Sequence, residues 1–157
     1  MSMSKIIRTT ADVMFMFIMV FGFYIVLHGH LTPGGGFQGG AVIATAFILL
    51  IVAHHMDDFL GWFKKDSFQT CEMSGLVLFI GTALAAISLG YLFFMNFLSG
   101  KGGLFGQFVP FGINQGFMST AGTIPIMNIA VGIEVLGGLT IIILYMTSGI
   151  QSPEEGK

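Results

Sequence analysis

Charge is the scarcest property of this sequence. Among 157 residues there are 6 Lys or Arg and 8 Asp or Glu, so 9% of the chain is charged, against about 25% in soluble domains. A chain this poor in charge cannot cover a water-facing surface, and 54% of its residues are hydrophobic. The bilayer is therefore the expected solvent. The net charge of −2 excludes the broad basic surface of a nucleic-acid-binding protein.

Cysteine is nearly absent, and we expect no cleaved leader. Cys71 is alone, which excludes an intrachain disulfide and a site built from several thiolates. Lys5 and Arg8 precede an apolar run over residues 13–27, as in a signal peptide. A His-Gly-His stretch and glycines follow this run in place of a small-residue cleavage site, so we interpret it as a retained membrane helix.

Four apolar segments are long enough to cross a bilayer. We expect transmembrane helices at about residues 9–27, 37–55, 74–97 and 125–146. The sequence therefore predicts an all-α integral membrane protein that forms one domain over residues 1–157, with a glycine-rich break between the first two helices. This break would lie at or inside the membrane boundary, where irregular backbone is tolerated only if protein or a water-filled cavity covers it.

The positive charges predict the orientation. Five of the six Lys and Arg residues lie before the first helix, between the second and third, or at the end of the chain, and only Lys101 lies on the other side. By the positive-inside rule, both termini face the cytoplasm of a multi-pass protein of the cell membrane. The loop over residues 98–122 then lies outside. Its phenylalanines predict that it rests in the membrane interface or against a partner.

Glu134 is the most informative single residue. It lies near the middle of the fourth expected helix among apolar or small neighbours. A charge at the bilayer centre costs roughly 2.5–3.5 kcal/mol on insertion scales, so such residues usually face a bundle interior or a wet cavity. One hypothesis is a relay site for protons or sodium, and the other is an acid that only hydrogen-bonds a neighbouring helix. Asn128, nearly two turns earlier, is a candidate for the same polar stripe.

Histidines occupy the ends of the first two helices. His28 and His30 flank a glycine and are candidates for a proton relay, because histidine titrates near neutral pH. The alternative, which we favour, is an interfacial pair that fixes the helix end by hydrogen bonds. His54 and His55 lie near two aspartates, but no convincing third and fourth ligand follows, so we expect no metal site.

The glycine-rich stretch contains the letters of a nucleotide-binding motif. Residues 34–39 spell G-x-G-x-x-G. That fingerprint has meaning only between a strand and a helix of a βαβ unit, and here its flanks are membrane helices. We interpret the stretch as a tight backbone break, which either lines a path for ions or water or allows close helix packing.

The same stretch carries a family resemblance. Residues 29–40, GHLTPGGGFQGG, resemble the G-H-x-x-P-G-G-G-F-x-G-G signature of the MrpB-type (MnhB-type) subunits of multisubunit sodium/proton antiporters. The segment over residues 119–140 looks like the last helix of that family. The positions that match the signature are Gly29, His30, Pro33, Gly34, Gly35, Gly36, Phe37, Gly39 and Gly40.

The resemblance implies a subunit with no catalytic residues and no cofactor of its own. Its partners would be the other membrane subunits of an antiporter module, with sodium and protons as the transported ions and lipid around it. Similar subunits occur in archaeal complexes that join such a module to a nickel–iron hydrogenase or a related redox module. The motif residues and His28 are carried over as structural and candidate ion-path residues. The alternative is a scaffold that packs between larger channel subunits without touching an ion.

Overall fold

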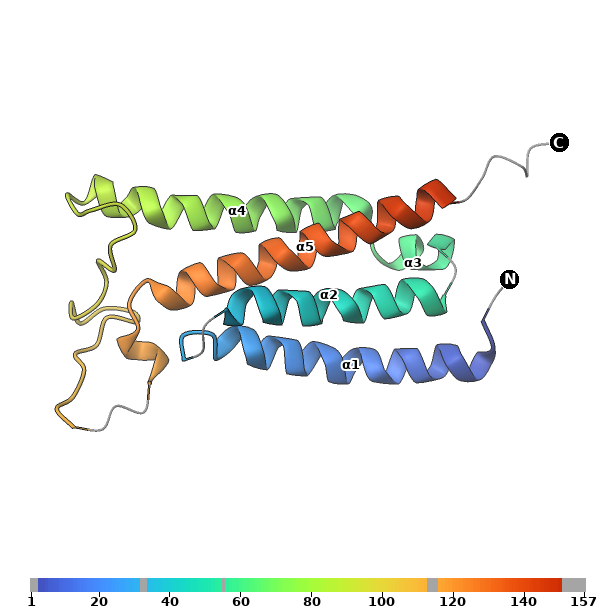
Figure 1. Cartoon of the computed structure of the whole chain (residues 1–157), viewed down its shortest axis with the longest axis horizontal. Helices are drawn as coiled ribbons and strands as arrows, with labels where there is room; N and C mark the ends of the chain where they lie inside the picture. Colours follow the sequence, from blue (N-terminus) through green and yellow to red (C-terminus); the bar gives the residue numbers. More distant parts are fainter. Residues whose placement is uncertain (1–2, 32–33, 55, 113–115, 151–157) are drawn as a thin grey trace.

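The computed structural model describes residues 3–31, 34–54, 56–112 and 116–150, and within these ranges it contains helices and no strand. In chain order the helices are α1 (Lys5–Leu27), α2 (Gly35–Ala53), α3 (Met56–Trp62), α4 (Lys65–Ser88) and α5 (Ile124–Ile150), with a short 3-10 turn at Met118–Thr120 (Figure 1). Pro33 and His55 lie outside the described residues.

The four long helices lie side by side in one row, in the order α4, α5, α2, α1 (Figure 1). α5 packs against both α4 and α2, and α2 packs against both α5 and α1. The start of α1, the end of α5 and the short helix α3 share one end of the row, which we call the α3 end (Figure 1). The opposite end, which carries residues 89–112 and 116–123, is called the loop end.

All four long helices are long and apolar enough to cross a membrane, which confirms the expected all-α membrane fold. The hydrophobic window of α2 is 56% buried within the chain, whereas those of α1 and α4 are each 17% buried. An apolar helix with so little burial must face lipid or another protein. The outer two helices of the row therefore present most of their surface to surroundings other than this chain.

Glycines allow the helices of the row to touch backbone to backbone. A Cβ on Gly40 of α2 would lie 2.5 Å from the Gly132 carbonyl oxygen of α5. On the other side of α5, a Cβ on Gly75 of α4 would lie 2.5 Å from the Glu134 nitrogen. Membrane helices associate through such small-residue contacts because lipid tails compete equally well for large apolar side chains.

The largest difference from the expected helices is at α4, which we expected over residues 74–97. It begins at Lys65 because Lys65, Gln69 and Glu72 are good helix formers and Asp66 suits the first turn. It ends at Ser88 because Gly90, with φ 79°, closes a Schellman motif in which the Tyr91 N–H donates to the Ala86 carbonyl. This shift places Glu72 two turns inside a membrane helix.

The other expected ends differ by a few residues, and α3 was not expected. α1 starts four residues before the expected 9–27, and α2 lies two residues before the expected 37–55. α5 extends the expected 125–146 at both ends. α3 forms from residues that we expected in a loop.

Asn96, expected at a helix end, instead fastens the long loop to the start of α5. Its side-chain amide donates to the Ala121 carbonyl at 3.0 Å, and its Oδ1 accepts from the Thr123 N–H at 2.7 Å. The loop between these residues keeps exposed phenylalanines, including Phe108 and Phe111. Their contact with lipid or a partner stays a prediction.

We predict opposite effects for alanine at two glycines of α4. Gly75→Ala places a methyl group against the α5 backbone and forces α4 and α5 apart. This should lower the free energy of unfolding by about 1–3 kcal/mol. Gly81 has open space around it, so Gly81→Ala should be neutral or stabilise by up to about 1 kcal/mol. Thermal unfolding of the two variants in the same detergent is the test. Equal stabilities would contradict the close α4–α5 contact.

Candidate functional site

The candidate site begins with a cavity of about 520 Å³ at the loop end, between the first turns of α2 and α5 and the middle of α4. Its polar lining comes from His30, Asn128 and the backbone around Gly34, and its apolar lining includes Phe37 and Phe79. The cavity therefore lies where the glycine-rich turn after α1 meets α2, α4 and α5. It can admit water at the polar wall, because it is far larger than the ~10–15 Å³ that one water needs.

The signature glycines make this junction possible. Gly34 has φ 84° at the N-cap of α2, a conformation that side chains disfavour. A Cβ on Gly35 would overlap the Gly29 Cα, and one on Gly36 would overlap the Asn128 carbonyl oxygen. The Asn128 side-chain amide donates to the Val26 carbonyl near the end of α1. Three chain segments thus meet at glycines, and the Asn128 side chain links α5 to the end of α1.

His28 and His30 occupy different surroundings. The His28 ring is exposed, lies 2.9 Å from the Tyr24 carbonyl oxygen through Nδ1 and packs on the Tyr24 ring. The His30 ring is half-buried at the cavity, with Nε2 2.7 Å from the Gly116 carbonyl oxygen and Nδ1 3.2 Å from that of Leu27. The two rings do not line one cavity, so only His30 stands at the candidate site.

Glu134 and Asn128 do not form the shared stripe that we expected. Asn128 turns toward the α1–α2 junction, whereas the backbone at Glu134 lies against Gly75 of α4. Six residues advance a helix by about 600°, which leaves the two side chains on different flanks. The Glu134 side chain is half-buried. Within the described residues, no group hydrogen-bonds or ion-pairs with its carboxylate.

Glu72 is a second membrane carboxylate, and the sequence did not predict it. We expected it in a polar loop, but α4 carries it alongside α5. Its Oε1 would lie 3.4 Å from a Cβ on Gly138. The available signal was the helical spacing of Lys65, Gln69 and Glu72, which are four and three residues apart.

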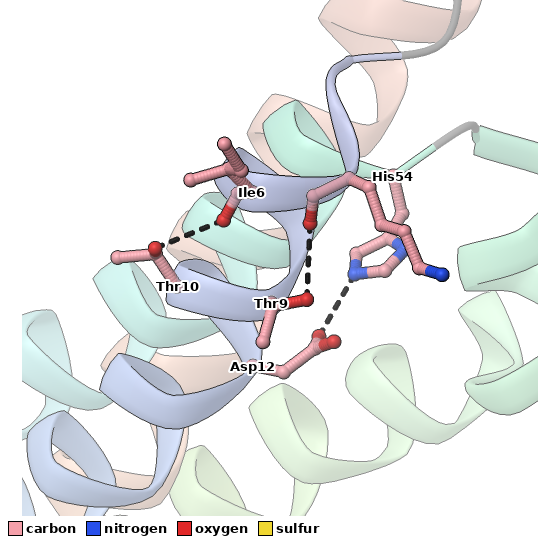
Figure 2. A network of polar contacts seen from close by, with 6 residues as sticks. Ile6, Thr9, Thr10, Asp12 and His54 are labelled. Carbon is pink, nitrogen blue, oxygen red and sulfur yellow. Dashed lines mark hydrogen bonds and ion pairs between the residues drawn. The ribbon is translucent and has the colours of Figure 1, made fainter.

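Asp12 and His54 form a second unexpected feature, at the α3 end (Figure 2). The His54 Nε2 lies 2.8 Å from the Asp12 Oδ1, and the side chains are 9% and 53% exposed respectively. The His54 ring also packs edge-on against Trp62, 5.0 Å between ring centres. The contact fastens α1 to the end of α2. The expected helices placed both residues at the cytoplasmic side of the membrane, and this was the one feature of the sequence that pointed to the contact.

A metal site would need at least three His, Cys, Asp or Glu side chains close together. No such group is found in the part of the chain that the structure describes. Since His55 lies outside that part, the expectation that this chain holds no metal stays a prediction. The polar side chains at the cavity are the His30 imidazole and the Asn128 amide, whereas the Glu72 and Glu134 carboxyl groups belong to the α4–α5 contact. Such groups inside a membrane can bind or pass protons and cations.

We predict that Gly29 and Asn128 are energetically coupled. A Cβ on Gly29 would overlap the Asn128 side-chain amide, so Gly29→Ala should destabilise the chain by about 1–3 kcal/mol. In the Asn128→Ala background the same methyl group finds space, and the added cost should fall by about 1 kcal/mol or more. A double-mutant cycle of unfolding free energies measures this. Additive effects would contradict the described junction.

Comparison with known proteins gives one family for nearly the whole chain. A family model described as "Domain related to MnhB subunit of Na+/H+ antiporter" matches residues 6–154. An uncharacterized protein of Methanocaldococcus jannaschii is 38% identical over 87% of this chain and 50% of its own length.

Two bacterial relatives carry the name "Putative antiporter subunit mnhB2". The protein of Staphylococcus haemolyticus is 32% identical over 56% of this chain and 62% of its own length. The protein of Staphylococcus aureus strain Newman is 30% identical over 59% of this chain and 64% of its own length. The chain thus spans between half and about two thirds of the length of these relatives. The match over residues 6–154 shows that this chain belongs to the family of domains related to the MnhB subunit of Na⁺/H⁺ antiporters.

Proposed function

We propose that this chain is a membrane subunit of a multisubunit sodium/proton antiporter module and that it contributes Glu134 to an ion path. The observation that carries the proposal is the position of this carboxylate. It lies inside a membrane-spanning helix, half-buried, with no partner for its charge among the described residues. A carboxylate in such a place is costly, and it usually serves an ion or proton pathway.

The row of helices supports a path that is shared with another subunit. Four helices side by side do not surround a pore, because α1 and α4 lie at opposite ends of the row (Figure 1). A path along Glu134 therefore needs a second wall. The sparse burial of α1 and α4 leaves ample apolar surface for neighbouring subunits and lipid.

A scaffold that conducts no ion is the second candidate. It is favoured by the signature glycines, since Gly29, Gly35 and Gly36 each have a packing reason to be small. It leaves the carboxyl group of Glu134, which has no partner among the described residues, without an explanation, so we place it second.

The assembly and its orientation belong to the same proposal. The α3 end carries most of the positive charges and would face the cytoplasm of a multi-pass protein in the cell membrane. The partners would be other antiporter-module subunits, either in a stand-alone exchanger or in a complex with hydrogenase-like subunits that drives ion flow by electron transfer. Mass spectrometry of the proteins that co-purify in mild detergent separates these two settings.

We predict that Glu134→Gln blocks exchange in an assembled complex. Glutamine keeps the shape of the side chain but cannot carry the proton or the charge, so sodium-driven proton movement in proteoliposomes should fall by about 100-fold. Asp58→Asn, at an exposed acid of α3, is the matched control and should transport normally. Normal transport by an assembled Glu134→Gln complex would reject the path and leave the scaffold.

A further inference from the structure

One flank of α4 carries polar side chains from the α3 end toward the middle of the membrane. Lys65, Gln69, Glu72, Leu76 and Phe79 follow each other at spacings of four, three, four and three residues. Residues at these spacings lie on one face of a helix. The polar members come first and the apolar members last, so the polar stripe extends inward from the α3 end.

The adjoining flank of α5 carries a matching stripe in the opposite direction. Val131, Glu134, Gly138 and Tyr145 are separated by three, four and seven residues and so share one face. Gly137, which faces α4, sits so close to the Glu72 backbone nitrogen that a Cβ would come within 2.6 Å of it. The two stripes therefore run next to each other along the α4–α5 contact, which we call the seam.

The two acidic residues of the seam lie at similar levels along the helix contact, because Gly75 of α4 lies against the Glu134 backbone and Gly137 of α5 lies against the Glu72 backbone. Glu72 Oε1 lies over Gly138, where the absence of a side chain leaves it space. Glu134 is one turn from Gly138 on the same flank, and side chains four residues apart are roughly 5–6 Å apart at their Cβ atoms. Gly138 thus makes room for a carboxylate from α4 at a point one turn along α5 from Glu134.

A cavity adjoins the seam toward each of its ends. At the α3 end, a cavity of about 90 Å³ is lined by Lys65, Asp66, Gln69, Ile141, Leu144 and Tyr145. It has room for several waters and offers them polar partners. Toward the loop end, Val131 lines the 520 Å³ cavity that also contains His30 and Asn128. From Val131 to Tyr145 the helix rises about 21 Å, most of the ~30 Å hydrocarbon thickness.

We propose that the α4–α5 seam is a proton path, in which the Glu72–Glu134 pair relays protons between the inner cavity at Lys65 and Tyr145 and the outer cavity at His30 and Asn128. The proposal rests on the proposed function and extends it to a route and to a second carboxylate. A partner subunit would close the open side of the seam, since Leu76 and Tyr145 are exposed in this chain.

The chemistry of the seam suits a proton better than a metal cation. A proton needs one carboxylate oxygen at a time, whereas hard cations take several oxygen ligands together. The seam offers two carboxylates and the Gln69 amide between apolar side chains. The ionisable side chains of the two stripes are Lys65 and Glu72 of α4 and Glu134 and Tyr145 of α5, and α2, on the other side of α5, has no ionisable residue.

The test uses the complete complex in proteoliposomes, with proton and sodium fluxes recorded separately. Glu72→Gln should reduce proton flux by about 100-fold, as we expect for Glu134→Gln, and Glu72→Asp should recover part of it. Gly138→Leu fills the space beside the Glu72 carboxylate and should also block the flux. Gly81→Leu adds the same bulk to α4 where the structure is open, and should transport normally.

The outcomes separate this proposal from the proposed function. Normal proton flux in assembled Glu72→Gln and Gly138→Leu complexes, with Glu134→Gln blocked, overturns the seam and keeps Glu134. Normal flux in Glu134→Gln rejects the proposed function itself. Loss of sodium flux with unchanged proton flux overturns the assignment to protons.

A second measurement does not depend on transport by the altered carboxylates. Ile141→Cys in a Cys71→Ser background places a thiol on the inner cavity. It should react with a membrane-impermeant reagent added from the α3 side, faster than Val77→Cys on an outer flank of α4. A thiol at position 141 that stays unreactive in an assembled, transporting complex shows that the cavity is dry and overturns the path.

Discussion

The structure depends on the backbone contact that α5 makes on both of its sides. Gly132 meets Gly40 of α2 on one side, and Gly137 and Glu134 meet α4 on the other. In a bilayer, large apolar side chains gain little by leaving lipid for protein, so dispersion contacts at short range and hydrogen bonds must hold the helices together. Small residues on opposite flanks of α5 therefore produce a row with α5 between its neighbours.

The row determines where polar chemistry can stand. The two flanks of α5 that meet α2 and α4 are filled by backbone contact, which leaves its remaining flanks for side chains. Glu134, Gly138 and Tyr145 share one of these flanks, next to Glu72 of α4. The glycines that close the helix contacts and the carboxylates that stand next to the α4–α5 contact are consequences of the same arrangement. An uncompensated membrane carboxylate is then stable only if a partner or water attends it.

The sequence predicted the membrane class and the four spans, because apolar length alone carries that information. It misplaced α4, because Asp66, Gln69 and Glu72 were interpreted as a loop although they are compatible with a helix whose polar side faces a cavity. The position of Glu134 in the interior of its helix was predicted. The contact of Asn128 with Val26 was not, because a spacing of six residues was taken as nearly two turns although it rotates the side chain to another flank of the helix. The Asp12–His54 contact joins residues 42 positions apart and needs the tertiary arrangement.

The central claim is that another subunit covers the face of α5 that carries Glu134. Ile142 lies on this face, one turn beyond Gly138, and is 53% exposed. A photo-reactive amino acid at position 142, activated in native membranes, measures directly what covers it. We predict a crosslink to a second protein of the antiporter module. Adducts with lipid alone, in a complex shown to be intact, would contradict a shared ion path along this chain.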